Sequence, residues 1–204
     1  NFLTLKENVC TAISYGYGHL WIAEYNHLYI YKDGAIESFL QFPYQVSISA
    51  VKELKNGNLI VGTFSSGVYY LDKNKQVTQL LPDIGRVSVV YEDSKNDIWI
   101  GSYTTGLYCF QDTRLVEHYC TVASRKECRL SSDFVRDICE DNKGGIWIGT
   151  SLGINRLDED KQNLAFFDEG ERDSWKLSDC SVWSLYKDVQ GTIWIGTYYG
   201  GVNY

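Results

Sequence analysis

A six-residue segment recurs along this chain, and it constrains the fold more than any other feature. Residues 97–102 read Asp-Ile-Trp-Ile-Gly-Ser, with close copies at residues 145–150 and 192–197 and weaker copies at residues 58–63 and 19–24. From one copy to the next along the chain, the third residue of the segment is separated by 39, 39, 48 and 47 residues. The residues at this position are Trp21, Ile60, Trp99, Trp147 and Trp194. Five units with a period of about 40 residues predict a repeat architecture.

Each unit predicts four strands, and the recurring segment is the second of them. This strand is apolar at consecutive positions, which is typical of a strand with both faces covered. The inner strands of a β-propeller blade are covered in this way by the neighbouring blades. We therefore predict an all-β chain, a β-propeller with about five four-stranded antiparallel blades, in which the five central residues anchor the blades. The alternative is an open β-sandwich, which has no reason to repeat one hexapeptide at a fixed period.

The predicted units cover the whole chain as a single propeller segment, residues 1–204. Their approximate limits are 6–42, 43–81, 82–119, 120–168 and 169–204, and residues 1–5 are expected to be the fourth strand of a neighbouring blade. The glycine after each central segment is expected to make room for a ring of the adjacent blade. The polar turns before the second strands are rich in Asn, Asp and Gly, which tolerate left-handed backbone angles.

All five units carry a family resemblance, which covers nearly the whole chain and is closest in two of them. Residues 130–141, continuing through 145–150 to 153–158, resemble the two-component regulator propeller repeat, and residues 177–204 are a second close match. The first two units fit least well, with Ala23-Glu24 in place of Gly-Thr and Ile60 in place of tryptophan. The resemblance implies the periplasmic sensor region of a hybrid two-component histidine kinase, commonly one that controls polysaccharide use. It also implies a seven-bladed array, of which these blades would be a part, although five blades could close alone.

Composition agrees with an extracytoplasmic piece of a larger protein. The net charge of −7 argues against nucleic acid and anionic membrane as partners, because both favour basic surfaces. The sequence contains no run of 18 apolar residues, so it predicts no transmembrane helix. The chain contains no methionine, and its first residues lack the features of a signal peptide. The expected partners are neighbouring blades and downstream domains of the same protein, where a kinase histidine would lie.

The sequence offers little for catalysis, metal or cofactor binding. The paired carboxylates Glu92-Asp93 and Glu140-Asp141 recur at the same turn, which favours turn chemistry over a glycosidase pair. The three histidines have no spacing that suggests a ligand set or a general base. We therefore predict no enzyme activity, no metal and no cofactor in this segment.

The six cysteines form no metal signature. Cys10, Cys109 and Cys139 lie on strand patterns and are expected to be buried as small hydrophobes. Cys120 and Cys128 flank one long loop and are candidates for a disulfide in an oxidising periplasm. Sequence cannot give the Cα separation that such a bond requires.

A ligand site is expected on the rim formed by the loops after the second strands and by the connections between blades. Aromatic side chains and a few charges there suit a carbohydrate, since sugar rings stack on aromatic faces. The candidate ligand-binding residues are Tyr25, Phe64, Tyr103, Arg172, Trp175, Tyr198 and Tyr199. Trp175 could instead fold back and pack against a blade.

Two classes of function remain open at this point. The first is a module that senses an oligosaccharide and signals to a distant kinase. The second is a rigid scaffold that binds a partner domain or a second copy of the chain, without a small ligand. Exposed aromatic residues serve both, because tyrosine and tryptophan also anchor protein interfaces.

Overall fold

The structure, a computed structural model, describes residues 10–123, 125, 128–168 and 176–204. The chain divides into two compact units, Asn1–Val87 and Ser88–Tyr204, and each is described by itself. The predicted strand at residues 1–5 lies outside the described residues. Within the described ranges, no helix has the length and apolar character needed to cross a membrane.

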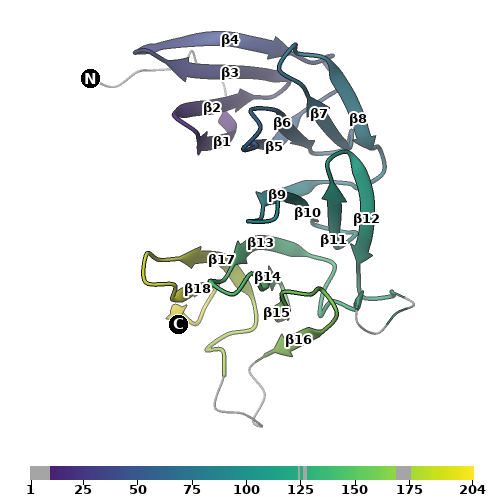
Figure 1. The fold of residues 1–204 in the computed structure, drawn as a ribbon, viewed down its shortest axis with the longest axis vertical. Helices are drawn as coiled ribbons and strands as arrows, with labels where there is room; N and C mark the ends of the chain where they lie inside the picture. Colours follow the sequence, from purple (N-terminus) through teal and green to yellow (C-terminus); the bar gives the residue numbers. More distant parts are fainter. Residues whose placement is uncertain (1–9, 124, 126–127, 169–175) are drawn as a thin grey trace. The chain divides into compact units, whose positions relative to one another are not determined.

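The first unit contains two four-stranded antiparallel sheets, which we call the first and second blades (Figure 1). In both sheets the strands lie side by side in the order of the sequence. The first blade consists of β1 (Cys10–Gly16), β2 (His19–Glu24), β3 (His27–Lys32) and β4 (Ala35–Gln41). The second consists of β5 (Ile48–Glu53), β6 (Leu59–Thr63), β7 (Val68–Leu71) and β8 (Val77–Leu81).

The second unit contains the third, fourth and fifth blades, built in the same order (Figure 1). The third blade is β9 (Val87–Glu92), β10 (Asp97–Ser102), β11 (Leu107–Gln111) and β12 (Arg114–Tyr119), and its first residue is the boundary between the units. The fourth is β13 (Val135–Glu140), β14 (Ile146–Thr150), β15 (Gly153–Leu157) and β16 (Leu164–Phe167). The fifth is β17 (Val182–Lys187), β18 (Ile193–Thr197) and β19 (Val202–Asn203). The all-β prediction is confirmed.

All five predicted anchors lie on second strands, as expected. Trp21, Ile60 and Trp99 are buried there, whereas Trp147 is partly buried and Trp194, in the three-stranded fifth blade, is 38% exposed. Trp99 belongs to a core cluster that joins the third and fourth blades, together with Leu107, Val135 and Ile148. Burial between sheets therefore accounts for the continuous apolar run in these strands.

In the second, third and fourth blades the glycine after the central segment makes room for a valine, not for the ring that was expected there. A Cβ on Gly62 would lie 2.4 Å from Cγ1 of Val87, and one on Gly149 would lie 2.6 Å from Cγ1 of Val182. Both valines are the first residues of the next blade's first strand. Blade spacing is therefore set by contact between a second strand and the following first strand.

A β-bulge explains why the first strands show apolar residues three apart. Val135 pairs with Thr150 and Asp137 with Gly149, so Arg136 is the extra residue of a bulge. The same shift leaves Trp183 as the extra residue in β17 and Ser49 as the extra residue in β5. A bulge changes the direction of side chains along a strand, and this lets Val135 and Ile138 both be buried.

Carboxylates at the predicted turns hold the tryptophans, which confirms their structural assignment. Asp141 Oδ1 accepts hydrogen bonds from the backbone N–H groups of Lys143 and Gly145 at 2.9 and 2.8 Å. Asp141 Oδ2 accepts one from Nε1 of Trp147 at 3.0 Å. In the fifth blade Asp188 makes the corresponding bond to Trp194 at 2.8 Å. One side chain therefore closes the turn and orients the indole ring of the following strand.

Candidate functional site

Five aromatic side chains form a continuous row across the three blades of the second unit, and we call this row the aromatic strip. Tyr198 and Tyr199 lie in the loop between β18 and β19, and Trp183 lies in β17. They are 56%, 85% and 55% exposed, respectively. Phe134, just before β13, and Tyr103, in the loop between β10 and β11, complete the strip and are partly buried.

The rings of the aromatic strip form two groups, and the rings within each group are in contact. The ring centroids of Tyr198 and Tyr199 are 4.5 Å apart, and those of Trp183 and Tyr198 are 5.5 Å apart. Tyr103 and Phe134 are separated by 4.2 Å. The guanidinium of Arg136 connects the two groups, because its central carbon lies 4.4 Å from the ring centroids of both Phe134 and Trp183.

Local backbone structure positions the exposed end of the strip. The hydroxyl of Thr197 donates to the carbonyl of Gly201 at 3.1 Å and accepts from the N–H of Gly200 at 3.1 Å. Tyr198 N donates to the carbonyl of Ser181 at 2.9 Å, which ties the loop to the chain just before β17. The threonine of the repeated Gly-Thr pair therefore shapes the loop that presents Tyr198 and Tyr199.

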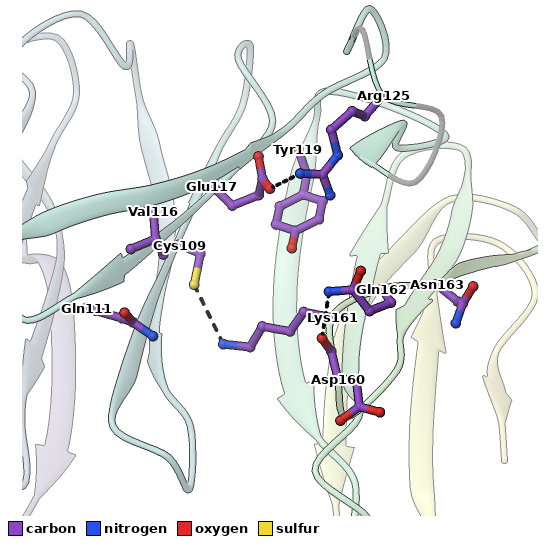
Figure 2. Close-up of a pocket in the computed structure, with 10 residues that line it drawn as sticks. All are labelled: Cys109, Gln111, Val116, Glu117, Tyr119, Arg125, Asp160, Lys161, Gln162 and Asn163. Atoms are coloured by element: carbon purple, nitrogen blue, oxygen red, sulfur yellow. Dashed lines mark hydrogen bonds and ion pairs between the residues drawn. The ribbon is translucent and has the colours of Figure 1, made fainter.

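A second candidate is a polar hollow of about 680 Å³ in the same unit, between β11, β12 and the turn after β15 (Figure 2). Two of its charged residues, Arg125 and Glu117, form an ion pair. Arg125 Nη1 donates to Glu117 Oε2 at 2.9 Å, and Gln162 Nε2 donates to the carbonyl of Asp160 at 3.3 Å. Lys161 extends across the hollow toward Cys109 in Figure 2.

Lys161 is a connection between blades. Its ammonium donates to Asp97, lies 3.8 Å from Asp93 Oδ2, and stands 4.7 Å from the ring centroid of Trp99. Burial acts to lower the pKa of Lys161, but the hydrogen bond to Asp97 and the nearby charges raise it overall. The amine is therefore charged and paired, which does not suit a nucleophile or a base.

Three segments of the chain are similar to a known repeat family. A model described as "Two component regulator propeller" matches residues 80–104, 129–152 and 176–199. Three of the five units therefore match the two-component regulator propeller repeat. Comparison with curated protein sequences gives no match.

Solved structures that resemble the chain include extracellular domains of two proteins described as hybrid two component systems, both from B. thetaiotaomicron. One is 25% identical with a TM-score of 0.75, covering 95% of this chain and 26% of that one. The other is 18% identical with a TM-score of 0.73, covering 94% and 26%. The chain therefore spans about a quarter of the length of these relatives, and its sheets are propeller blades.

A virginiamycin B lyase from Staphylococcus aureus is also similar in structure. It is 14% identical with a TM-score of 0.72, covering 98% of this chain and 71% of that one. At this identity the likeness concerns the fold alone. The repeats thus occur on a fold that also supports catalysis, and function depends on the site residues.

The histidines of the repeats have structural partners. His118 Nε2 donates to the carbonyl of Thr105 at 2.6 Å, and its ring stacks on Tyr108 with centroids 4.1 Å apart. His19 Nδ1 lies 3.0 Å from Glu53, and His27 Nε2 lies 2.7 Å from the hydroxyl of Ser38. Among the described residues, no group of three potential ligands is arranged to hold a metal ion.

The structure brings together only part of the predicted ligand-binding set. Tyr103, Tyr198 and Tyr199 belong to the aromatic strip, whereas Tyr25 and Phe64 belong to the first unit. Tyr25 is 52% exposed, and Phe64 is covered by the guanidinium of Arg86 at 4.7 Å. The two remaining predicted residues, Arg172 and Trp175, lie outside the described residues.

The structure does not join Cys120 and Cys128 by the disulfide that was considered for them. The backbone N–H of Cys120 does bond to the carbonyl of Cys128 at 3.0 Å. However, Cys128 is buried in the core cluster around Trp99, whereas the Cβ of Cys120 lies beside Gly106. Backbone pairing brings the residues together while their side chains enter different surroundings.

The other cysteine predictions were correct in two of three cases. Cys109 and Cys139 are buried, and burial raises the pKa of their thiols to about 12 and about 11. Cys10 is exposed, contrary to expectation. In the first blade the neighbouring Ile13 is also exposed, so the weakest copy of the repeat does not keep the apolar pair on its first strand.

Three residues of the site were missed by sequence reasoning: Phe134, Arg136 and Trp183. Arg136 and Trp183 occupy the position after the first valine of β13 and β17. The available signal was the three-residue apolar spacing, which implies an extra residue at this position. A large side chain at a bulge can therefore contribute to a site, as one in a loop does.

Proposed function

We propose that this chain is part of the extracytoplasmic, periplasmic sensor region of a two-component signalling protein and that its aromatic strip recognises an oligosaccharide. The observation that carries the proposal is the run of exposed rings from Trp183 through Tyr198 to Tyr199. Sugar rings present C–H faces that stack on aromatic rings, while hydroxyl groups require polar partners. The repeats and the likeness to extracellular domains of hybrid two component systems support the sensor role.

The test is calorimetric titration of the protein with a panel of neutral and acidic oligosaccharides. Trp183→Ala combined with Tyr198→Ala should weaken binding about tenfold or more, since each lost stacking contact contributes on the order of 1 kcal/mol. Tyr186→Ala is the matched control, because Tyr186 is also an exposed aromatic of β17 but lies outside the strip.

The opposing outcomes separate this proposal from the scaffold alternative. If no oligosaccharide binds and the chain associates with itself or with another domain through the same residues, the strip is a protein interface. Loss of dimerisation in the double variant, measured by analytical ultracentrifugation, would establish that function in place of sugar recognition.

A further inference from the structure

The guanidinium within the aromatic strip carries information about the ligand. Arg136 is a bulge residue of β13, held between the faces of Phe134 and Trp183 at 4.4 Å from each ring centroid. The bulge removes it from strand pairing, so its side chain is placed by the two rings. Stacking on both sides limits the rotamers of the side chain and fixes the plane of its donors.

No described residue accepts a hydrogen bond from Arg136. Its Nε is buried, and no acceptor of the described part of the chain lies within hydrogen-bond distance of it. Within the described ranges, no ion pair with Arg136 is found, although the chain has an excess of acidic residues. By contrast, the guanidinium of Arg156 forms an ion pair with Asp141 at 2.7 Å. An arginine fixed in position without an anion is suited to bind one from outside.

We propose that the aromatic strip takes an acidic oligosaccharide, with Arg136 binding a carboxylate or sulfate group of one sugar. The inference rests on the proposed function and deepens it by naming the class of ligand. The flanking rings of Trp183 and Tyr198 would stack on the sugar faces, and the planar guanidinium would pair with the anionic group. Carboxylate and sulfate share the oxygen geometry that arginine recognises, so the experiment distinguishes them.

The test compares three probes on the full chain by isothermal titration calorimetry: α-1,4-tetragalacturonic acid, its methyl ester, and a sulfated heparin tetrasaccharide. The first two have the same sugar rings and differ in charge. We expect at least one acidic probe to bind, and the uronate to bind about tenfold or more tightly than its ester if carboxylate is the group. A preference for the heparin tetrasaccharide with no uronate binding would assign sulfate. Affinity for the acidic probe should fall as salt is raised.

Variants separate the role of Arg136 from a general charge effect. Arg136→Gln should weaken binding of the acidic probe about tenfold or more, and Arg136→Lys should restore only part of it because the ammonium lacks the planar fork. Arg114→Gln is the matched control: it removes one positive charge from an exposed residue of β12 and should leave affinity unchanged. The circular dichroism spectrum and the thermal midpoint of each variant report whether the fold is kept.

Two results would overturn the proposal. If the acid and ester bind equally and Arg136→Gln has no effect, or if only neutral sugars from the panel bind, the ligand is not acidic, while the oligosaccharide function stands. If no sugar of any kind binds, the proposed function and this inference fail together.

Discussion

The indole Nε1 of Trp99 donates a 2.9 Å hydrogen bond to Oδ2 of Asp93, six residues earlier in the chain. Asp93 Oδ1 accepts from the N–H groups of Lys95 and Asp97 at 2.9 and 2.8 Å. The carboxylate, 2% exposed, therefore joins a turn to the centre of a blade. The same spacing of six links Asp141 to Trp147 and Asp188 to Trp194.

The second blade shows how the pair changes when the ring is absent. Ile60 has no donor, and the residue six positions before it is Leu54, which is buried. In the first blade, Trp21 donates instead to Glu53 Oε2 of the second blade at 2.8 Å. A carboxylate therefore accompanies the indole of all four anchor tryptophans, because a buried N–H without an acceptor would be costly.

The buried anchor predicts a graded response to truncation. Trp99→Ala should lower the free energy of unfolding by about 3–5 kcal/mol, the usual range for a buried large aromatic. Trp194→Ala should cost clearly less, because that ring is 38% exposed. Thermal and urea unfolding of both variants measure the difference. Equal losses would contradict the assignment of Trp99 to the core between blades.

The contact between Gly149 and Val182 predicts a compensating pair. Gly149→Ala should destabilise the fold by about 1–3 kcal/mol, since its Cβ would lie 2.6 Å from Cγ1 of Val182 and overpack the contact. Val182→Ala, which removes that methyl group, should cost less in the Gly149→Ala background than in the wild type. A double-mutant cycle measures the coupling, and strict additivity would exclude a direct contact.

The strands were predictable because their signals are local. Apolar runs, and Asn, Asp and Gly at turns, are encoded within a few residues, so the recurring segments form the second strands as predicted. The Trp–Asp spacing could also have been found by counting six residues back from Trp99, Trp147 and Trp194.

The candidate site was less predictable because it depends on packing between blades. Tyr198 and Tyr199 were identified from their loop, but the contact of Arg136 with Trp183 joins residues 47 positions apart in different blades. The direction of a bulged side chain and the separation of Cys120 from Cys128 depend on the three-dimensional arrangement, which residue spacing does not determine.

Asp141 predicts how stability depends on pH. Burial acts to raise its pKa, but hydrogen bonds from Arg156, Gly145 and Trp147 lower it below the usual value of about 4. Its contribution is therefore present at neutral pH and is lost as pH falls through the pKa of the folded state. Asp141→Asn should lower the free energy of unfolding at pH 7 by about 2 kcal/mol and flatten its decline in acid.

Asp137 provides a control, because its pKa is shifted in the opposite direction to that of Asp141. Burial raises its pKa, and the N–H groups of Leu185 and Ile138 only partly offset this effect. Its contribution is complete below the pKa of the unfolded state and is lost as pH rises through the folded value. Unfolding curves of Asp141→Asn and Asp137→Asn from pH 3 to 7 should therefore differ from the wild type in opposite directions. A common slope would contradict these assignments.

The ion pairs of Lys161 are expected to stabilise the contact between the third and fourth blades. Lys161→Met keeps the aliphatic chain over Trp99 but leaves Asp97 and the buried Asp93 without their cation. Removing one partner of a buried ion pair costs about 3 kcal/mol or more, because the remaining charge stays desolvated. The loss should shrink in acid, where protonation removes the charge of the carboxylates.

Lys143→Met is the control, since Lys143 is an exposed turn residue of the same blade, and it should change the thermal midpoint little. If both variants melt like the wild type at pH 7, Lys161, which extends across the polar hollow of Figure 2, does not stabilise the contact between the two blades.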